Sequence, residues 1–378
     1  MEPDIASPLL GGLSPAQFMR RHWQKKPLLV RQALPGITPP LPRARLFELA
    51  ARDGVESRLV QQRDGVWSLR HGPLPRRALP PLARPHWTLL VQGLDLHEPA
   101  AHALLRRFGF VPDARLDDLM LSYASDGGGV GPHLDSYDVF LIQVHGQRRW
   151  RIARTRDHTL VEGVPLKILR HFAPEQEWLL QPGDMLYLPP RWAHDGVAVG
   201  ECMTASVGFR AAAATELARE LLMRVADGLE PAPRERIYGD AAQPATATPA
   251  AMPPALQDFA AAALRKALRD PRSMARALGE WLTEPKAQVW FDAGYSAFDT
   301  ACGVVLDRRT RMLYDARHVF INGESFEARG RDARLLRRLA DQRRLQADAV
   351  RGFSPEARTT LDDWARAGWL RASAGGGS

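Results

Sequence analysis

The chain has 378 residues, of which 45% are hydrophobic and 25% charged, a composition ordinary for a soluble globular protein. No stretch approaches the roughly 18 apolar residues that a membrane span requires, and the acidic start MEPDIASPLLGG does not resemble a signal peptide. Two cysteines, Cys202 and Cys302, exclude a disulfide framework and a cysteine-based zinc site. We therefore expect a cytoplasmic protein.

The chain is strongly basic, with a net charge of +8, and only five of its 51 basic residues are Lys. Residues 301–378 hold 15 Arg against 10 acidic residues, so +5 of the charge lies there. Two explanations stay open: biased codon usage, or a polyanionic partner such as RNA or a ribosome.

In chain order, residues 14–60 predict helix and short strand, beginning at a Ser14 cap. A Pro-rich stretch (72–85) precedes a predicted strand at 87–92 and a predicted helix at 97–108. From Leu116 to about Phe209, short apolar runs alternate with Gly and Pro turns. That pattern is typical of an antiparallel sandwich or barrel.

After residue 210 the sequence pattern changes and predicts an alanine-rich helix. A Pro/Ala-rich loop is predicted at 230–254, followed by further helix up to 284. Residues 285–378 mix short strands with two helical runs and end in ASAGGGS, a predicted flexible tail.

His133 and Asp135 stand at the start of a strand-like segment, GPHLDSYDVFLIQV. Their spacing of two residues places both side chains on one face of an extended chain. Two imidazoles and one carboxylate hold non-heme Fe(II) and leave coordination positions open. His194 is the candidate third ligand, because it follows GDMLYLPPRWA, a strand and then a Pro-Pro turn.

Arg148 is the second unusual residue, because strand alternation places it in phase with Trp150 and Ile152 after a predicted turn at His145-Gly146. A lone inward guanidinium is costly unless an anion neutralises it. A dicarboxylate cosubstrate in the barrel would do so through a bidentate contact.

Ordinary structural roles are the alternative for these residues. A histidine on a strand face is usually hydrogen-bonded in the core or at the surface. An inward arginine usually pairs with a carboxylate of the protein itself, and Asp138 or Asp184 would serve. The combination of the His-x-Asp pair, a later His194 and an in-phase Arg148 favours a metal site.

The segment GGGVGPHLDSYDVFLIQVHGQRRWRI, together with GDMLYLPPRWAHDGVA and MTASVGFR, resembles the JmjC/cupin-type ribosomal oxygenases. In particular it is similar to the bacterial branch that hydroxylates an arginine of the sixteenth large-subunit ribosomal protein. The motifs FMRRHWQKKPLLVR and WTLLVQGLDLHEPA agree, and the similarity covers about residues 14–210.

The resemblance implies a mainly β plus α fold. Residues 1–210 would form a double-stranded β-helix catalytic domain, 211–284 a helical dimerisation region, and 285–378 a winged-helix-like domain. It implies an Fe(II)-dependent dioxygenase that uses O2 and 2-oxoglutarate. His133, Asp135 and His194 match the iron ligands, and Arg148 matches the residue that binds the 5-carboxylate of 2-oxoglutarate.

Further contacts are expected around the pocket. Ser122, Thr204 and Ser206 are candidate contacts to 2-oxoglutarate, although the sequence does not decide whether the face with Thr204 and Ser206 points inward. Asp126, in the glycine-rich loop before His133, is a candidate partner of a target guanidinium, and a turn-capping role is the alternative. Tyr137 is a candidate pocket residue or a core tyrosine.

Other functions remain open from the sequence. The barrel suits another JmjC oxygenase, such as a histidine hydroxylase or a lysine demethylase, or a metal-dependent hydrolase or isomerase. A non-catalytic cupin-like DNA-binding regulator would have no reason to keep all three ligands and Arg148. Contact between nucleic acid and the C-terminal domain is uncertain, since its arginines resemble a solvated helix face. They are Arg334, Arg337, Arg338, Arg343 and Arg344.

Overall fold

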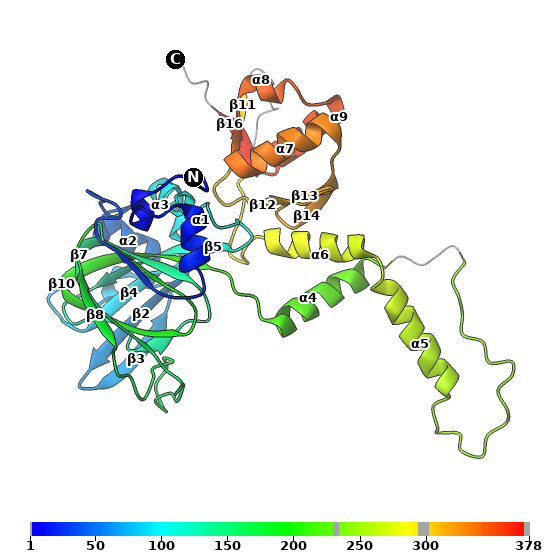
Figure 1. The fold of residues 1–378 in the computed structure, drawn as a ribbon, viewed down its shortest axis with the longest axis horizontal. Coiled ribbons are helices and arrows are strands. Elements are labelled where there is room, and N and C mark those ends of the chain that lie inside the picture. The colour runs from blue at the N-terminus through cyan, green and yellow to red at the C-terminus, as the bar shows by residue number, and fades with distance from the viewer. Residues whose placement is uncertain (1, 230–233, 294–301, 374–378) are drawn as a thin grey trace. The chain divides into compact units, whose positions relative to one another are not determined.

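The computed structural model describes residues 2–229, 234–293 and 302–373, and it divides into two compact units, Met1–Ala211 and Ala212–Ser378 (Figure 1). Residues 230–233 of the predicted loop and residues 374–378 of the predicted flexible tail lie outside the described residues. Among the described residues, no helix is both long enough and apolar enough to cross a bilayer.

The first unit is built on a ten-stranded antiparallel sheet in the order β1-β9-β7-β10-β5-β4-β2-β3, with β6 paired to β10 and β8 to β7. This confirms the predicted antiparallel barrel. The strands are β1 Leu28–Val30, β2 Ser57–Arg63, β3 Val66–His71, β4 Trp87–Val91, β5 Leu116–Ala124, β6 His133–Leu134, β7 Val139–Arg154, β8 Gln176–Leu180, β9 Met185–Leu188 and β10 Trp192–Phe209.

Two long strands, β7 and β10, pair with each other along most of their length. The predicted turn at His145-Gly146 is wrong, because β7 continues through it. Gly146 has φ +61°, and a Cβ there would collide with the backbone oxygen of Glu201 on β10. The register of the two strands shifts at this point, between Val199 and Met203, so the chain bulges instead of reversing.

The bulge bends both strands from one layer of the barrel to the other. The first half of β7 pairs with β9, and the second half pairs with β8. The strands curl around the interior in Figure 1 and form a double-stranded β-helix, the fold that the sequence predicts.

Short helices cover the outer face of this sheet, where an aromatic core includes Phe18, Phe140 and Tyr187. Ser14 caps the first helix as predicted, since its Oγ accepts from Gln17 N at 3.2 Å. The helices are η1 Pro8–Leu10, α1 Pro15–Arg21, α2 Arg43–Ala50, η2 Arg76–Ala78, η3 Leu94–Leu96 and α3 Pro99–Arg106.

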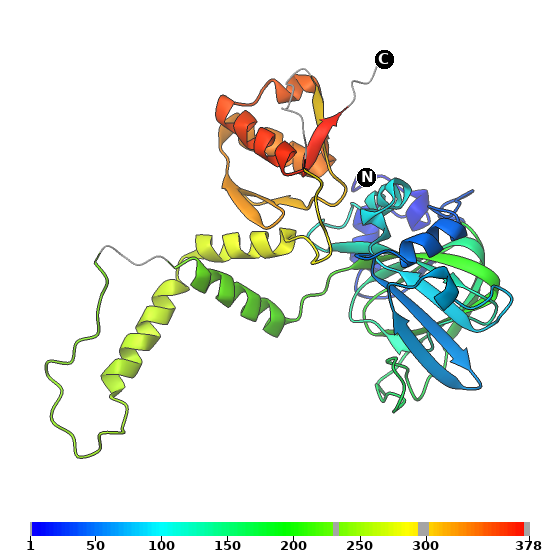
Figure 2. The ribbon, with the colours of Figure 1, turned by 180° about the vertical axis from the view of Figure 1, so that it is seen from behind.

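The second unit contains three helices and a small mixed domain with its own core (Figure 2). Helix α6 contacts α4, β13 and β14, while α7 contacts β12 and β15, and α9 contacts β16. The elements are α4 Ala214–Asp227, α5 Pro254–Ala267, α6 Pro271–Thr283, β11 Gly303–Leu306, β12 Met312–Tyr314, β13 His318–Ile321, β14 Glu324–Glu327, α7 Gly330–Gln342, β15 Arg344–Leu345, α8 Ala347–Val350, α9 Pro355–Arg366 and β16 Leu370–Ser373.

Candidate metal and cosubstrate site

Three side chains that the sequence singles out converge at one end of the barrel. Strand β6 pairs with the start of β10 so that His133 lies opposite His194. The carboxylate of Asp135 lies 3.9 Å from His133 Nε2 and 3.5 Å from His194 Nε2. One ligand atom from each residue lies within 4.8 Å of the other two, which is close enough for a single metal ion.

Backbone carbonyls orient both imidazole rings. Nδ1 of His133 lies 2.9 Å from Gly131 O, and Nδ1 of His194 lies 2.9 Å from Trp192 O. A proton on each Nδ1 satisfies these carbonyls, so each Nε2 keeps its lone pair toward Asp135. This donor set, two neutral imidazoles and a carboxylate, fits a divalent iron site with open positions.

Burial favours the neutral form of His194. The side chain is almost completely buried and lies beside His133, and both effects lower its pKa to about 4. A neutral imidazole at physiological pH is the form that coordinates a metal ion.

Arg148 is buried at 4% exposure and pairs with no carboxylate among the described residues. Its Nη1 donates to Ser122 Oγ at 3.1 Å and to Thr204 Oγ1 at 3.2 Å, whereas its Nε has no partner in the described part of the chain. The two expected alternatives are engaged elsewhere: Asp138 accepts from Tyr187 Oη at 2.6 Å, and Asp184 accepts from Arg31 at 2.6 Å.

The metal-ligand candidates and Arg148 line the same cavity, whose volume is about 470 Å³. The cavity therefore has an anionic metal-binding end and a cationic group that pairs with no carboxylate in the described part of the chain. An unpaired buried guanidinium is costly, and a ligand carboxylate removes that cost. The residues present fit a metal ion together with an acidic small molecule.

Four of the remaining predicted residues lie at this cavity. Ser122, Ser206 and Tyr137 line it, and Thr204 lies next to it through its bond with Arg148 and a 2.9 Å bond to Gln143. The sequence did not decide whether the face of β10 with Thr204 and Ser206 points inward. In the structure this face is buried on the cavity side. Burial and the nearby Asp135 carboxylate raise the pKa of Tyr137.

Asp126 does not lie there. Its Oδ1 accepts from Gly200 N at 2.8 Å, and Asp126 is absent from the residues that line the cavity. The turn-stabilising alternative accounts for its position, so its expected contact to a target guanidinium has no geometric support.

Sequence reasoning missed several residues that the fold brings to the cavity. Trp150 lies between the two ends, with Arg148 Cζ 5.5 Å from its ring centroid and His194 at 5.9 Å between ring centroids. The sequence does contain a signal for Trp150, because strand alternation places it on the same face as Arg148. The others come from strands whose pairing the sequence does not specify: Arg58, Gln92, Asp117, Asp118 and Met120.

The C-terminal arginines have partly structural roles. Arg337 donates to Ala316 O at 2.8 Å, and Arg343 donates to Asp307 O at 2.7 Å and to Thr310 O at 2.9 Å. Whether this domain contacts nucleic acid stays an open question.

Known protein families match both units. Residues 103–217 match the model of a JmjC domain, and residues 263–371 match a ROXA-like winged helix. With the His-Asp-His cluster in a double-stranded β-helix, these matches define a JmjC protein that also carries a winged helix.

The chain is 35% identical to ribosomal protein uL16 3-hydroxylase of Escherichia coli, over 84% of this chain and 86% of that protein. It is 40% identical to a probable ribosomal oxygenase of Haemophilus influenzae over 52% of this chain and 50% of the relative. The solved structure of YcfD, a ribosomal oxygenase from Escherichia coli, in complex with cobalt and 2-oxoglutarate matches with a TM-score of 0.79. That match has 29% identity and covers 95% of this chain and 98% of YcfD. The chain therefore belongs to the ribosomal oxygenase family.

Proposed function

We propose that this protein is an Fe(II)- and 2-oxoglutarate-dependent oxygenase that hydroxylates an arginine side chain of ribosomal protein uL16. The observation that carries the proposal is the buried Arg148, which shares a cavity with His133, Asp135 and His194 and pairs with no carboxylate in residues 2–229, 234–293 and 302–373. The oxygenase relatives include a uL16 3-hydroxylase and a structure that binds cobalt and 2-oxoglutarate, which support the same assignment.

In this proposal, His133, Asp135 and His194 hold Fe(II) through the two Nε2 atoms and one carboxylate oxygen. The bound iron supplies the coupling of 2-oxoglutarate oxidation by O2 to C–H hydroxylation, which yields succinate, carbon dioxide and the hydroxylated side chain. The Gly131 and Trp192 carbonyls keep both imidazoles in the coordinating tautomer.

Arg148 would bind the far carboxylate of 2-oxoglutarate. Ser122 and Thr204 each accept one of its N–H groups and fix the plane of the guanidinium, so the remaining donors meet a carboxylate in a set orientation. Ser206 lines the same cavity and adds a hydroxyl there. These residues bind and orient the cosubstrate.

The cavity is lined by both acidic and basic side chains besides the metal-ligand candidates. Asp117 and Asp118 lie there together with Arg58 and Lys167. Both carboxylates already have protein partners, since Asp118 accepts from Gly93 N at 3.0 Å and Asp117 lies 3.6 Å from Arg210. The arginine target is therefore supported by the uL16 3-hydroxylase relative.

Mass spectrometry of a uL16 peptide that spans the candidate arginine tests the function. With Fe(II), O2 and 2-oxoglutarate, we expect a gain of one oxygen on that arginine, and no gain when 2-oxoglutarate is left out. A peptide with lysine at that position is the matched control and should stay unmodified. Succinate formation without peptide oxidation would keep the oxygenase and reject the substrate, and neither product would reject both.

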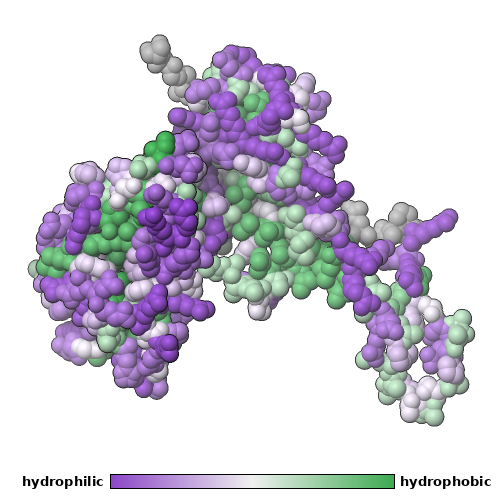
Figure 3. Space-filling model, viewed as in Figure 1, coloured by the Kyte–Doolittle hydropathy of each residue, from purple (hydrophilic) through white to green (hydrophobic). Residues whose placement is uncertain are grey.

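We also propose that the protein is a cytoplasmic homodimer and that helices α4 and α5 form the dimer interface. Large apolar side chains of this region are exposed: Leu222 46%, Met223 53%, Leu229 57%, Leu256 37% and Leu264 60%. Figure 3 shows hydrophobic residues gathered over α4 and α6. Contiguous exposed apolar surface of this kind marks protein–protein interaction sites.

A further inference from the structure

A second pocket of the first unit contains four cationic side chains, none of which belongs to the residues proposed to hold iron and 2-oxoglutarate. Its volume is about 480 Å³, within the range of small-ligand sites. It is lined by Gln24, Lys25, Arg154, Thr155, Arg156, Pro189, Pro190, Arg191 and Trp192. These lining residues include four basic side chains and no Asp or Glu, so their summed formal charge is positive.

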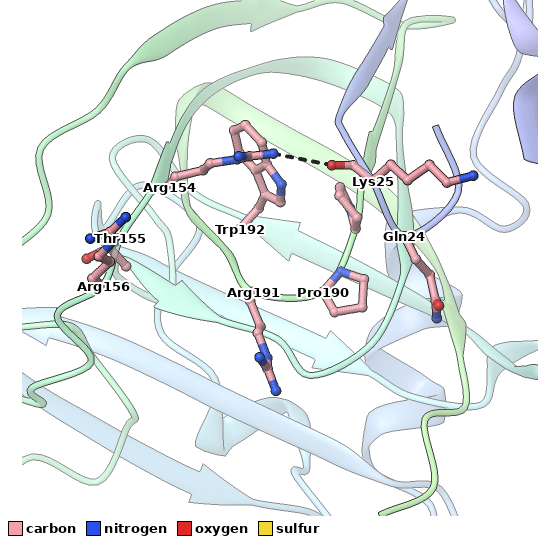
Figure 4. Close-up of a pocket in the computed structure, with 9 residues that line it drawn as sticks. Gln24, Lys25, Arg154, Thr155, Arg156, Pro190, Arg191 and Trp192 are labelled. Carbon is pink, nitrogen blue, oxygen red and sulfur yellow. Dashed lines mark hydrogen bonds between the residues drawn. The ribbon is translucent and has the colours of Figure 1, made fainter. Parts of the chain in front are cut away.

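Three separate chain segments contribute these cations. Lys25 lies in the turn that follows α1, Arg154 ends β7 with Arg156 just beyond it, and Arg191 lies in the turn between β9 and β10. In Figure 4, Arg154 lies along Trp192, with Arg156 and Thr155 on one side and Lys25 and Gln24 on the other. In Figure 4 the charged groups of Lys25 and Arg191 point away from Arg154, so the four cations surround the pocket and do not meet at one point.

None of the four cations pairs with a carboxylate among the residues that the structure describes. The Lys25 Nζ donates to two carbonyls at the end of α1, Met19 O at 3.3 Å and Arg20 O at 2.7 Å. Glu175 accepts from the backbone N–H of Arg154 at 3.2 Å and not from its guanidinium. Arg149 on the same unit, by contrast, pairs with Glu177 at 3.2 Å.

The walls of the pocket are held in place by hydrogen bonds. The backbone N–H of Gln24 donates to Tyr187 Oη at 2.8 Å, and the side-chain Nε2 of Gln24 donates to the buried Asp138 at 3.1 Å. The Arg191 N–H donates to the backbone oxygen of Asp135 at 2.9 Å. Because the backbone is fixed before a ligand arrives, less entropy is lost on binding.

The chemistry of the pocket favours RNA over an acidic protein segment. Arg154 Cζ lies 5.1 Å from the Trp192 ring centroid, so a flat guanidinium covers the indole, and arginine planes of this kind stack on unpaired RNA bases. Guanidinium groups also bind phosphate oxygens in a bidentate way. The chain is strongly basic, with a net charge of +8.

We propose that this pocket binds the phosphate backbone of single-stranded RNA through Arg154, Arg156 and Arg191, with Lys25 adding charge at its edge. The proposal does not depend on the oxygenase activity, because none of these side chains belongs to the residues proposed to hold iron or 2-oxoglutarate.

The test compares two triple variants of the full-length protein that remove the same charge. The pocket variant is R154Q/R156Q/R191Q, and the control is R77Q/R84Q/R107Q, three exposed arginines elsewhere on the same unit. The probe is a short fluorescein-labelled single-stranded RNA of mixed sequence, followed by fluorescence anisotropy at several salt concentrations. Thermal unfolding of both variants checks that they are folded.

We expect the pocket variant to bind RNA about tenfold or more weakly at low salt, and the control to change by less than about twofold. Each phosphate contact adds about 0.7 to the slope of log affinity against log salt, so losing three contacts should reduce the slope by about 2. Equal losses in both variants, or no loss in either, would overturn the proposal.

Two competitors identify the ligand class at constant ionic strength. A poly-glutamate peptide and inorganic phosphate should each displace the RNA far less well than unlabelled RNA does. Efficient displacement by the peptide would make the pocket an acidic-protein site. Efficient displacement by phosphate alone would make it a small-anion site, and either result would reject RNA as its ligand.

Discussion

At the scale of single residues, Arg148 separates a cosubstrate site from an ordinary metal site. A metal-dependent hydrolase or isomerase needs the three metal ligands but has no use for a buried guanidinium without a carboxylate partner. A protein that kept this residue for stability would pair it internally, as Asp184 is paired with Arg31.

Replacing Arg148 with Gln should therefore weaken 2-oxoglutarate binding and leave metal binding intact. Loss of a charged hydrogen-bonding group costs about 2–3 kcal/mol, which corresponds to roughly a 30- to 150-fold rise in the 2-oxoglutarate concentration required. Calorimetric titration of the cobalt-loaded protein with 2-oxoglutarate measures this directly.

The neighbouring Arg149 provides the matched control. It lies on the same strand but on the opposite, exposed face, where it pairs with Glu177 at 3.2 Å. Arg149→Gln should bind 2-oxoglutarate as the unchanged protein does. Equal effects in the two variants would mean that Arg148 has no special role in cosubstrate binding.

His194 predicts a pH dependence of the metal-free fold. Its pKa is lowered from 6.5 to about 4 by burial, so between these values the unfolded chain binds a proton that the folded chain does not. The contribution of His194 to the free energy of unfolding should be constant above pH 6.5. It should fall as the pH drops toward 4, by about 3 kcal/mol in total. Below pH 4 both states are protonated and the contribution levels off.

Urea unfolding in the presence of a chelator, repeated between pH 7 and pH 4, measures this effect. His194→Gln removes the titrating group, so the difference between the two stability curves isolates its contribution from other acidic and basic groups. Parallel curves would show that His194 has an ordinary pKa in the folded state.

At the scale of elements, the pairing of β7 with β10 positions both ends of the site. Gly196 on β10 lies opposite Trp150 on β7, and a Cβ at Gly196 would come within 2.7 Å of the Trp150 ring. The indole in turn contacts His194 and Arg148. A glycine at this position therefore allows the tryptophan to lie between the metal and cosubstrate ends.

Gly196→Ala should destabilise the protein by about 1–3 kcal/mol and weaken cobalt binding, because the ring must move toward His194. Gly208→Ala on the same strand is the control, since its Cβ would meet only Asp118 Oδ1 at 3.7 Å. Thermal unfolding and cobalt titration measure the two effects. Trp150→Leu should restore stability to the Gly196→Ala variant, and failure of that rescue would exclude the clash as the cause.

The sequence predicted the elements and the His133–Asp135 pair because both follow from local spacing, whereas His194 was a candidate because of the strand and Pro-Pro turn before it and because of the family resemblance. His133 and Asp135 share a face of any extended chain, and the burial of Arg148 and Trp150 follows the predicted alternation. The bulge at Gly146 was missed because a left-handed glycine looks the same in a turn and in a bulge. The hydrogen bond from Gly200 N to Asp126 could not be predicted, because only the folded sheet brings these two residues together, and the contact of Asp126 with a target guanidinium stays a prediction.

At the scale of the whole molecule, the two units differ in how well they bury their apolar side chains. The first unit has a large core that includes aromatic residues from α1, β7 and β9. Helix α4 has one buried residue, Val225, and α5 has none. Helices with apolar side chains and so little burial gain stability when they pack against another protein surface.

Introducing charge on these helices should therefore dissociate the proposed dimer. We expect L222E/L264E to behave as a monomer in size-exclusion chromatography with light scattering, because each buried carboxylate at an apolar interface is strongly unfavourable. The control T215E/Q257E adds the same charge at exposed polar positions of the same two helices and should stay dimeric. A dimeric L222E/L264E variant would exclude this surface as the interface, and a monomeric unchanged protein would exclude the dimer altogether.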